Sequence, residues 1–535
     1  MDKMGIKKYV YTLLAVVSVS VWSVNTSAEP GATDGRPLYF QNEVMSVLGT
    51  TPYGFNVKDY GAKGDGTGND APSINKTIAA AAAAGGGTVV LPPGTYLCGS
   101  IRLQSNIHLV IMQGAVIEAI NAREAYDQAE PNPWDKYQDF GHSHWHNGLL
   151  WGENLENISI TGSGMIHGKG LTRNMKRDAV PVGLGDKAIA LKNCRNVLLR
   201  DFTVYHGGHF ALLATGVNNL TIDNLKIDTN RDGLDLDGCK NVKVSNCSIN
   251  TPWDDAICLK SSFALGFATT TENMTITNCF VSGFQEGTML DGTYKPMDSA
   301  ASHATGRIKF GTESNGGFKN IAISNCVFDH CHGLALETVD GALLEDIAIS
   351  NITMRNINNS PIFLRLGSRM RAPEGTAVGQ LRRVNISDIV VYNADRRFAS
   401  IISGIPGHHI EDVKISNVRI IYEGGGTKED AAIKPPEEER SYPDPRMFGV
   451  IPSYGFYIRH ATGIELSNIT LRYDSVDERP PFILEDVAGA DFSRIKAQRE
   501  AGAATFMLHK VKNFTLSESR DLEDQKIDLA THKIF

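Results

Sequence analysis

Asn219-Leu220-Thr221-Ile222-Asp223-Asn224 is one copy of a phrase that returns along most of the chain. In each copy, apolar and polar residues alternate over a short run, which is typical of a β-strand with one buried face. Each run closes on an Asn, which tolerates left-handed turn geometry. The copies recur about every 22 to 30 residues, with occasional longer gaps, and this spacing predicts a solenoid of short parallel strands. We therefore predict an all-β fold, a single-stranded right-handed parallel β-helix. Further copies begin at Asn241, Asn273, Asn320, Asp346, Asp412 and Gly463.

The chain has 535 residues, yet the repeats favour one domain. A solenoid grows by adding turns, and no long Pro-rich or single-charge linker divides the sequence. We assign residues 54–535 to the β-helix domain and residues 29–53 to an N-terminal extension.

The first 28 residues have the pattern of a secretory signal peptide. Lysines precede an apolar run from Tyr9 to Val21, and the small residues Thr26-Ser27-Ala28 offer a cleavage site. No later segment reaches the ~18 apolar residues that a membrane span needs. We expect a mature protein that is secreted or periplasmic and not associated with a membrane.

An Ala-rich run from Ile74 to Ala84 predicts a helix before the first coils. Asp70 is placed to cap the start of this helix, and the glycine run at 85–87 ends it. The apolar face of the helix would plug the open end of the solenoid, which would otherwise expose its core and strand edges.

Eight cysteines are present. Cys247, Cys279 and Cys326 each follow the turn Asn, so they should stack inside the solenoid. An oxidising compartment permits disulfides, but a buried ladder of small side chains explains these residues equally well. The spacing of a zinc site is missing, and we predict no metal and no cofactor.

Two acidic stretches lie one coil apart, Asp232-Gly233 and Asp254-Asp255. At a period of about 22 residues, Asp232 stacks beside Asp254 and Asp255 on one surface. Clustered carboxylates push their pKa values apart, and one protonated acid and one ionised base can then coexist. Either stretch alone is ordinary turn chemistry. Together, at coil spacing, they favour catalysis.

These motifs resemble a known family. The segment Asp59-Tyr60-Gly61-Ala62-Lys63-Gly64-Asp65-Gly66 is similar to the opening of pectin-degrading β-helix enzymes. Asn230-x-Asp232, Asp254-Asp255 and the following Lys260-Ser261 resemble the signature of the polygalacturonases, glycoside hydrolase family 28.

The resemblance runs from about Phe55 to Leu471 and implies an inverting glycoside hydrolase. It implies that Asp254 is the general acid and that Asp232 and Asp255 activate the attacking water. Asn230 and Lys260 are expected to contact the substrate. Inversion implies carboxylates roughly 6.5 to 9.5 Å apart with water between them.

The chain also departs from the family pattern. The family's Gly-His-Gly is missing, and the letters Arg-Ile-Lys occur at Arg307 to Lys309, one coil too early. Counting back from the repeats places Glu337 in the same column as Asp232, with Arg307 and Lys309 on the coil between. We expect these three residues to replace the usual substrate contacts. The alternative is an ion-pair network between stacked coils.

His206 and His209 lie on the coil before Asp232. One of them, and we select His209, would reach the sugar or stand in for the missing histidine. A structural role for a histidine in a strand is the alternative. Trp253 either shields the carboxyl of Asp254 from water or flanks the turn as an apolar side chain.

The formal charge of −8 argues against nucleic acid as a partner. An acidic pectic polysaccharide would have to meet local cations, for which Lys260, Arg307, Lys309, Arg365, Arg369 and Arg371 are the candidates. The last three could instead form a solvated face. We expect the protein to be a monomer.

The favoured function is hydrolysis of α-linked galacturonic acid in polygalacturonan or rhamnogalacturonan. The alternatives are a calcium-dependent β-helix polysaccharide lyase and a non-enzymatic glycan-binding solenoid. Exo action is expected because three segments, 260–275, 283–305 and 423–447, are longer than a coil requires and could block one end of a groove.

Overall fold

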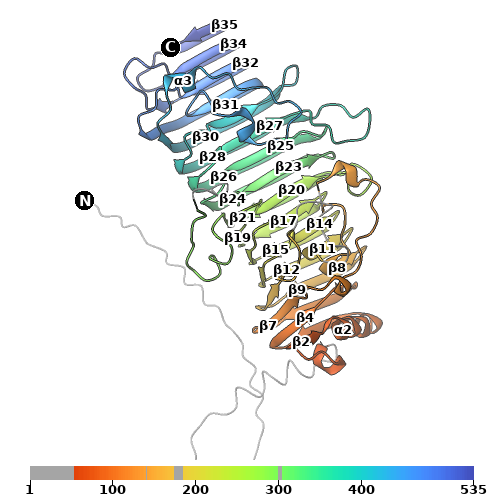
Figure 1. Ribbon diagram of the computed structural model, residues 1–535. Helices are drawn as coiled ribbons and strands as arrows, with labels where there is room; N and C mark the ends of the chain where they lie inside the picture. Colours follow the sequence, from red (N-terminus) through yellow and green to blue (C-terminus); the bar gives the residue numbers. More distant parts are fainter. Residues whose placement is uncertain (1–53, 140, 174–184, 299–303) are drawn as a thin grey trace, which may run out of the picture. The chain divides into compact units, whose positions relative to one another are not determined.

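The computed structural model describes residues 54–139, 141–173, 185–298 and 304–535, and its strands stack coil upon coil (Figure 1). Nearly all strand pairings are parallel, and the all-β, parallel β-helix prediction is confirmed. The chain divides into a unit of residues 1–51 and a unit of residues 52–535. The predicted signal peptide and N-terminal extension, residues 1–53, lie outside the described residues.

One face of the solenoid, which we call the site face, carries the acidic motifs. Each of its strands pairs in parallel with the equivalent strand of the next coil. The last coils contribute the first residues of three long strands, β31, β32 and β34. The shorter strands of the site face are β5 Ile101–Arg102, β8 Gly148–Glu153, β11 Lys187–Lys192, β14 Phe210–Thr215, β17 Asp232–Asp237, β20 Ile257–Ser261, β23 Ile308–Ser314, β25 Leu334–Thr338, β27 Ile362–Leu366 and β29 Ser400–Ser403.

A second face follows the repeated phrase directly. Its strands lengthen toward the C-terminus, because turns that interrupt the early coils are absorbed into continuous strands. The strands are β1 Gly54–Asn56, β3 Gly87–Leu91, β6 Ile107–Ile111, β9 Glu156–Thr161, β12 Arg195–Arg200, β15 Asn218–Asp223, β18 Lys240–Ser245, β21 Thr271–Thr277, β24 Phe318–Asp329, β26 Leu343–Ile357, β28 Gln380–Ala394, β30 Ile410–Gly424, β31 Phe456–Ser475, β32 Phe482–Ser493 and β34 Phe506–Ser517.

A third face completes the coils, and β35 closes the C-terminal end by pairing antiparallel with β34. The strands of the third face are β2 Asp65–Asn69, β4 Gly94–Cys98, β7 Ala115–Ala119, β10 Met165–His167, β13 Thr203–Tyr205, β16 Lys226–Asp228, β19 Ser248–Asn250, β22 Phe280–Ser282 and β33 Lys496–Ala497, while β35 spans Gln525–Ile534. Short 3₁₀ helices occur at Val57–Tyr60, Arg123–Ala125, Asp135–Tyr137 and Pro445–Phe448, and a short α-helix, α3, spans Lys428–Ala431.

The predicted capping helix is α2, Ala71–Ala83. Its buried face includes Ile74, Ile78 and Ala81, which join the core of the solenoid. Asp70 precedes the helix but makes no capping hydrogen bond. Its carboxylate instead accepts from the backbone N–H groups of Lys63 and Gly64, so the expected cap was wrong. No described helix is long and apolar enough to cross a membrane.

The repeat positions behave as expected from the sequence. The closing asparagines Asn246 and Asn278 are left-handed, with φ of 58° and 55°. The Asn278 amide donates to Asn246 of the coil before it at 3.3 Å, which forms part of an exposed asparagine ladder. All eight cysteines are buried and free, which supports the buried ladder over disulfides.

Candidate active site

Three carboxylates meet where the sequence places them, at the start of β17 and just before β20. One oxygen each from Asp232, Asp254 and Asp255 lies within 4.8 Å of the other two. The coil pairing brings them together, because the Gly233 N–H donates to the Asp255 carbonyl at 3.0 Å. These nearest oxygens are therefore closer together than the expected gap of roughly 6.5 to 9.5 Å.

These carboxylates line a cavity of about 290 Å³. Its walls come from the site face and from loops far away in sequence. The lining residues are Asp139, His142, His209, Arg231, Asp232, Asp254, Asp255, Lys260, Lys309 and Tyr442. A cavity of this size, lined by charged groups, suits a polar ligand and not an apolar one.

Asp255 is the carboxylate whose negative charge is most strongly held. Its two oxygens are bound separately, one by the Arg307 guanidinium at 2.9 Å and the other by the Lys309 ammonium at 3.0 Å. Burial alone would raise the pKa of Asp255, but Lys309 and Arg307 together lower it below its ordinary value. Asp255 is thus an ionised carboxylate in the resting site.

Asp232 has the opposite electrostatics. Burial, followed by the charges of Asp254 and Asp235, raises the pKa of Asp232 well above its ordinary value. One of its oxygens is buried without a hydrogen-bond partner. Asp232 therefore keeps its proton where Asp255 does not, which is the separation of roles that acid and base catalysis requires.

Asp254 is the most accessible of the three, with a side chain 23% exposed against 3% for Asp255. One of its oxygens contacts the Arg231 guanidinium at 2.6 Å. Arg231 also contacts His209 Nε2 at 3.3 Å, which ties the histidine to the acidic cluster. Asp254 is therefore positioned both to share a proton with Asp232 and to reach a ligand in the cavity.

The second layer of the site is a chain of buried charges. The Lys260 ammonium contacts Glu313 at 3.1 Å, and Asp235 lies at 3.9 Å. Burial raises the pKa of Asp235 to about 8, although Lys260 opposes this rise. Glu313 also contacts His142, whose pKa is lowered well below its ordinary value, chiefly by burial. Lys260 thus pairs with Glu313, while His142 stays neutral.

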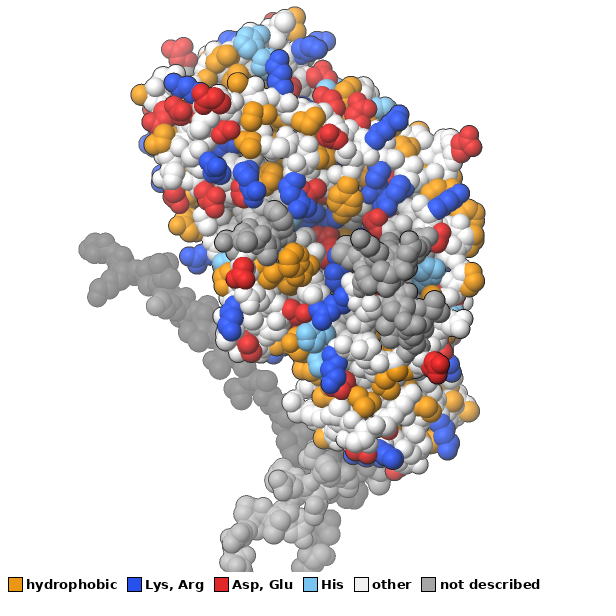
Figure 2. Space-filling model, viewed as in Figure 1, with side chains coloured by type: hydrophobic (Ala, Val, Ile, Leu, Met, Phe, Trp, Pro, Cys, Tyr) orange, Lys and Arg blue, Asp and Glu red, His pale blue; other side chains and the backbone are white. Residues whose placement is uncertain are grey.

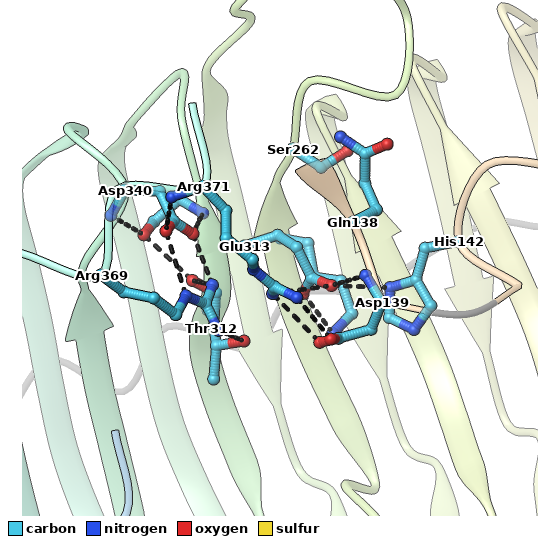
Figure 3. A network of polar contacts seen from close by, with 12 residues as sticks. Gln138, Asp139, His142, Ser262, Thr312, Glu313, Asp340, Arg369 and Arg371 are labelled. Atoms are coloured by element: carbon cyan, nitrogen blue, oxygen red, sulfur yellow. Dashed lines mark hydrogen bonds and ion pairs between the residues drawn. The ribbon is translucent and has the colours of Figure 1, made fainter. Parts of the chain in front are cut away.

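Two distant loops meet above this layer (Figure 3). Asp139 accepts from both terminal nitrogens of Arg371, at 2.5 and 3.2 Å. The Asp139 N–H donates to Glu313 at 2.9 Å, and Arg369 holds Asp340 beside the same strand, β23. The segment before β8 and the segment after β27 therefore form a wall of the cavity.

A third loop enters from the segment after β30. Tyr442 accepts from the Lys309 ammonium at 3.2 Å, although the tyrosine residue as a whole is 51% exposed. Its hydroxyl thus faces the cavity while much of the ring contacts solvent. Of the three long segments expected from the sequence, 423–447 supplies this residue.

The other two long segments lie nearby. Phe263 packs edge-on against Trp134 and Tyr137, at 5.4 and 5.5 Å between ring centroids. In the segment 283–305, Glu286 binds His206 and Arg173, at 2.8 and 2.6 Å. Both segments therefore pack against loops and turns next to the site face.

Several sequence-predicted residues lie where expected. Lys260, Lys309 and His209 line the cavity, while Arg307 reaches it through Asp255. Arg307 and Lys309 thus face the acidic cluster and also form ion pairs with Asp255. A position facing the cleft and an ion-pair network between coils are therefore compatible.

Asn230 is placed differently. Its backbone N–H donates to Glu286 at 3.1 Å, and its side-chain oxygen is buried without a partner. It does not line the cavity. Trp253 is 46% exposed and also lies outside the lining, so it does not shield Asp254.

The placement of Glu337 was wrong. Strand register aligns Leu336 with Phe310, Leu259 and Leu236, so Glu337 follows the column of Asp237 and not that of Asp232. The turn at 339–342 is longer than its counterpart after Asp237, and counting back from the repeat did not allow for these residues. Glu337 is buried beside Arg307, at 3.9 Å.

Of the expected basic residues, the three arginines in the stretch 365–371 are placed differently. Arg365 is 1% exposed and donates to the carbonyls of Glu437 and Glu438, so it is neither a solvated group nor a cavity residue. Arg369 and Arg371 are bound by Asp340 and Asp139. On the face seen in Figure 2, cationic and anionic side chains are interspersed.

Arg231, Asp235, Glu313, His142, Asp139 and Tyr442 were missed from the sequence. Asp235 had a signal, because the alternation in Asp232-Gly233-Leu234-Asp235-Leu236-Asp237 places it outward between two buried leucines. The loop residues carry no periodic signal.

Comparison with known proteins agrees with this fold. Residues 54–197 match a family described as rhamnogalacturonase A/epimerase, pectate lyase-like, and residues 187–363 match a right-handed β-helix region. The chain is 23% identical over 361 residues to an exopolygalacturonase of Arabidopsis thaliana, covering 64% of this chain and 72% of that protein.

A second relative is an exo-poly-alpha-D-galacturonosidase of Dickeya chrysanthemi, 23% identical over 394 residues, covering 62% of this chain and 60% of that protein. Among solved structures, a hyperthermoactive exopolygalacturonase from Thermotoga maritima superposes with a TM-score of 0.60. It shares 20% identity and covers 79% of this chain and 92% of its own.

Proposed function

Because the chain is a right-handed β-helix protein related to the polygalacturonases of glycoside hydrolase family 28, we infer that it is a glycoside hydrolase that cleaves α-linked galacturonic acid from the end of a pectic chain. The observation that carries this proposal is that the pKa of Asp232 is raised and the pKa of Asp255 is lowered in one cavity, which Asp254 also lines.

The acid is best described as a pair. Asp232 and Asp254 each have an oxygen within 4.8 Å of the other, close enough for a proton to pass between them. Buried Asp232 holds the proton at rest, and the more accessible Asp254 delivers it to the glycosidic oxygen. The Arg231 contact to Asp254 breaks or shifts as the substrate enters.

Asp255 acts on the water. Its charge stabilises the positive charge that develops at the anomeric carbon, and it accepts the proton that the attacking water loses. Both its oxygens are bound by cations, which keeps it ionised. We propose single displacement with inversion, as the resemblance to the polygalacturonases implies, to be checked by proton NMR of the first-formed anomer.

Local cations suit an acidic sugar despite the overall negative charge. Lys309, Lys260 and Arg231 all line the cavity. We propose that the sugar carboxylate binds at Lys309, where Tyr442 supplies a hydroxyl. His209, beside Arg231, is placed to contact a sugar hydroxyl.

Exo action follows from the loops. The Asp139–Arg371 pair joins two walls, and Tyr442 enters from a third segment. A cavity enclosed in this way accepts a chain end more readily than the middle of a polymer. We further propose that the mature protein is a monomer that is exported after removal of residues 1–28, as the sequence pattern predicts.

The test is digestion of homogalacturonan and of rhamnogalacturonan, with viscosity and reducing ends followed together. We expect reducing ends to accumulate while viscosity falls slowly, and mass spectrometry to show saturated monomer or dimer products. Early collapse of viscosity would contradict exo action. Unsaturated products that vanish with a chelator would support the calcium lyase, and binding without any product would support the glycan-binding solenoid.

A further inference from the structure

A second cluster of polar residues lies at one corner of three successive coils, away from the acidic cavity. It consists of His409, just before β30, His460 in β31 and Asp486 in β32. The residues that follow them pair in register, Ile410 with Ala461 and Ala461 with Val487. The three therefore occupy the same position of the repeat, and their side chains are stacked by the fold itself.

The three side chains converge on one point. His460 Nδ1 and His409 Nε2 lie 2.8 and 3.2 Å from the same carboxylate oxygen of Asp486. One donor atom from each residue lies within 4.8 Å of the other two. Two imidazole nitrogens and a carboxylate oxygen form a donor set that suits Zn²⁺ and similar divalent metals.

The outer nitrogens of both rings are also held. His460 Nε2 lies 3.2 Å from both oxygens of Glu437, and His409 Nδ1 lies 2.9 Å from the hydroxyl of Thr462. Histidines that bind metals are usually oriented in this way, with the second nitrogen bonded to a carboxylate or another oxygen. The cluster thus has an inner and an outer layer.

His460 in particular lies between two carboxylates. A neutral imidazole has one N–H, so it can donate to Glu437 or to Asp486 but not to both. If Nε2 donates to Glu437, the lone pair of Nδ1 faces the lone pairs of Asp486, and this repulsion needs a cation. Either a second proton or a metal ion can supply it.

The exposure of the cluster favours the metal ion. The side chains of His409 and Asp486 are 26% and 44% exposed, which leaves an entry path and room for water as a further ligand.

We propose that His409, His460 and Asp486 form a binding site for a divalent metal of the Zn²⁺ class, and that the metal holds in place the loop that carries Tyr442. A metal on Nδ1 of His460 fixes the proton on Nε2, and the ring then donates to Glu437. The backbone carbonyl of Glu437 also accepts from Arg365. Five residues later in the chain, Tyr442 contacts Lys309 in the cavity.

The site is tested by calorimetric titration of the chelator-treated full-length protein with Zn²⁺ at pH 7.5. We expect one zinc ion per chain with a micromolar or tighter Kd. His409→Ala and Asp486→Asn should each weaken binding at least 10-fold, with circular dichroism confirming that they fold. Ca²⁺ should not compete, because the two nitrogens disfavour a hard cation.

Two control variants locate the metal. Asp254→Asn alters the catalytic cluster, and His532→Asn alters a separate histidine pair, in which His532 and His509 lie 3.0 Å apart. Both should bind zinc as the wild type does. The site would be overturned if the wild type bound no zinc at about 100 µM, the weakest Kd expected of a specific site. Zinc binding that survives His409→Ala would overturn it as well.

A separate experiment tests whether the metal holds the loop that carries Tyr442 in place. Trypsin can cleave after exposed Arg440, within the loop. We expect zinc to slow this cleavage several-fold in the wild type and to leave it unchanged in His409→Ala. Equal cleavage rates with and without zinc, in a protein that binds zinc, would overturn the effect on the loop.

Discussion

Two regions of the site face bury charge and surround it differently. Around β17, β20 and β23, the outward positions carry Asp235, Lys309 and Glu313, and Lys309 lines a cavity. Toward the C-terminus, Arg365 on β27 aligns with Ser403, and Ser403 aligns with Arg459 on β31. There the charges are covered by a loop.

Hydrogen bonding separates the two regions. Arg365 and Arg459 donate to backbone carbonyls of residues 435–438 and to Ser403. In the catalytic region, one oxygen of Asp232, both oxygens of Asp235 and both oxygens of Glu337 are buried without a hydrogen-bond partner. Buried polar groups are normally satisfied. The difference indicates that the loop-covered C-terminal region serves stability, while the catalytic region has polar atoms available to a ligand.

The sharpest test of this contrast is Asp254→Asn. We expect turnover on polygalacturonate to fall 10²- to 10⁴-fold with substrate binding nearly unchanged, because a general acid is lost. An aryl galacturonide with a good leaving group needs little protonation, so its hydrolysis should fall far less. A variant that keeps more than about a tenth of wild-type activity on the polymer would remove Asp254 from the acid role.

Asp232 and Asp254 should behave as one unit, because the first holds the proton that the second delivers. We expect the double replacement by Asn to cost little more turnover than the more damaging single replacement, because residues acting together are non-additive. Rates of the two single variants and the double variant give the answer. Losses that add fully in log rate would assign the two carboxylates to separate steps.

Sequence reasoning succeeded where the repeat itself determines position. Asp232, Asp254 and Asp255 were brought together by coil spacing alone, and the asparagine and cysteine ladders followed from the same period. The placement of Glu337 failed because a longer turn at 339–342 shifts the register without changing the strand pattern. His142, Asp139 and Tyr442 could not be found, because loops fold over the solenoid through contacts that no local pattern encodes.

In the loop-covered region, removal of a buried arginine should lower the stability of the fold more than the catalytic rate. We expect Arg459→Met to lower Tm by a few degrees, because the carbonyl of buried Pro435 loses its donor, at about 1 to 3 kcal/mol for a group left buried and unpaired. Differential scanning calorimetry measures the shift. The exposed Arg419→Met is the matched control and should leave Tm within about one degree. Equal shifts in the two variants would mean that the loop is not anchored by Arg459.

Glu337 tests the catalytic region through pH. Burial raises its pKa to about 7 from an ordinary 4.5, so the folded state binds its proton more tightly than the unfolded state. This contribution to stability is present below about pH 4.5 and is lost as pH rises to about 7. Glu337→Gln mimics the protonated form, so its Tm should exceed that of the wild type increasingly between pH 5 and 8, by up to about 3 kcal/mol in stability.

The matched control for Glu337 is the exposed Glu411→Gln, which should track the wild type across the same pH range. A Glu337→Gln variant that is less stable than the wild type at pH 8 would mean that the carboxylate is ionised there and supports Arg307. The two Glu337 oxygens that lack hydrogen-bond partners would then belong to an ionised carboxylate that is available to a ligand.

The smallest expected effect is at the point where the two regions meet. Tyr442 belongs to the loop that the arginines hold, yet its hydroxyl contacts Lys309 in the cavity. Tyr442→Phe removes one hydrogen bond, worth about 1 kcal/mol, so kcat/KM should fall about fivefold with Tm unchanged. The exposed Tyr392→Phe is the control and should alter neither value. No change in kcat/KM would place Tyr442 outside the ligand's reach. A loss beyond about a hundredfold would exceed one hydrogen bond and would give the tyrosine a part in proton transfer.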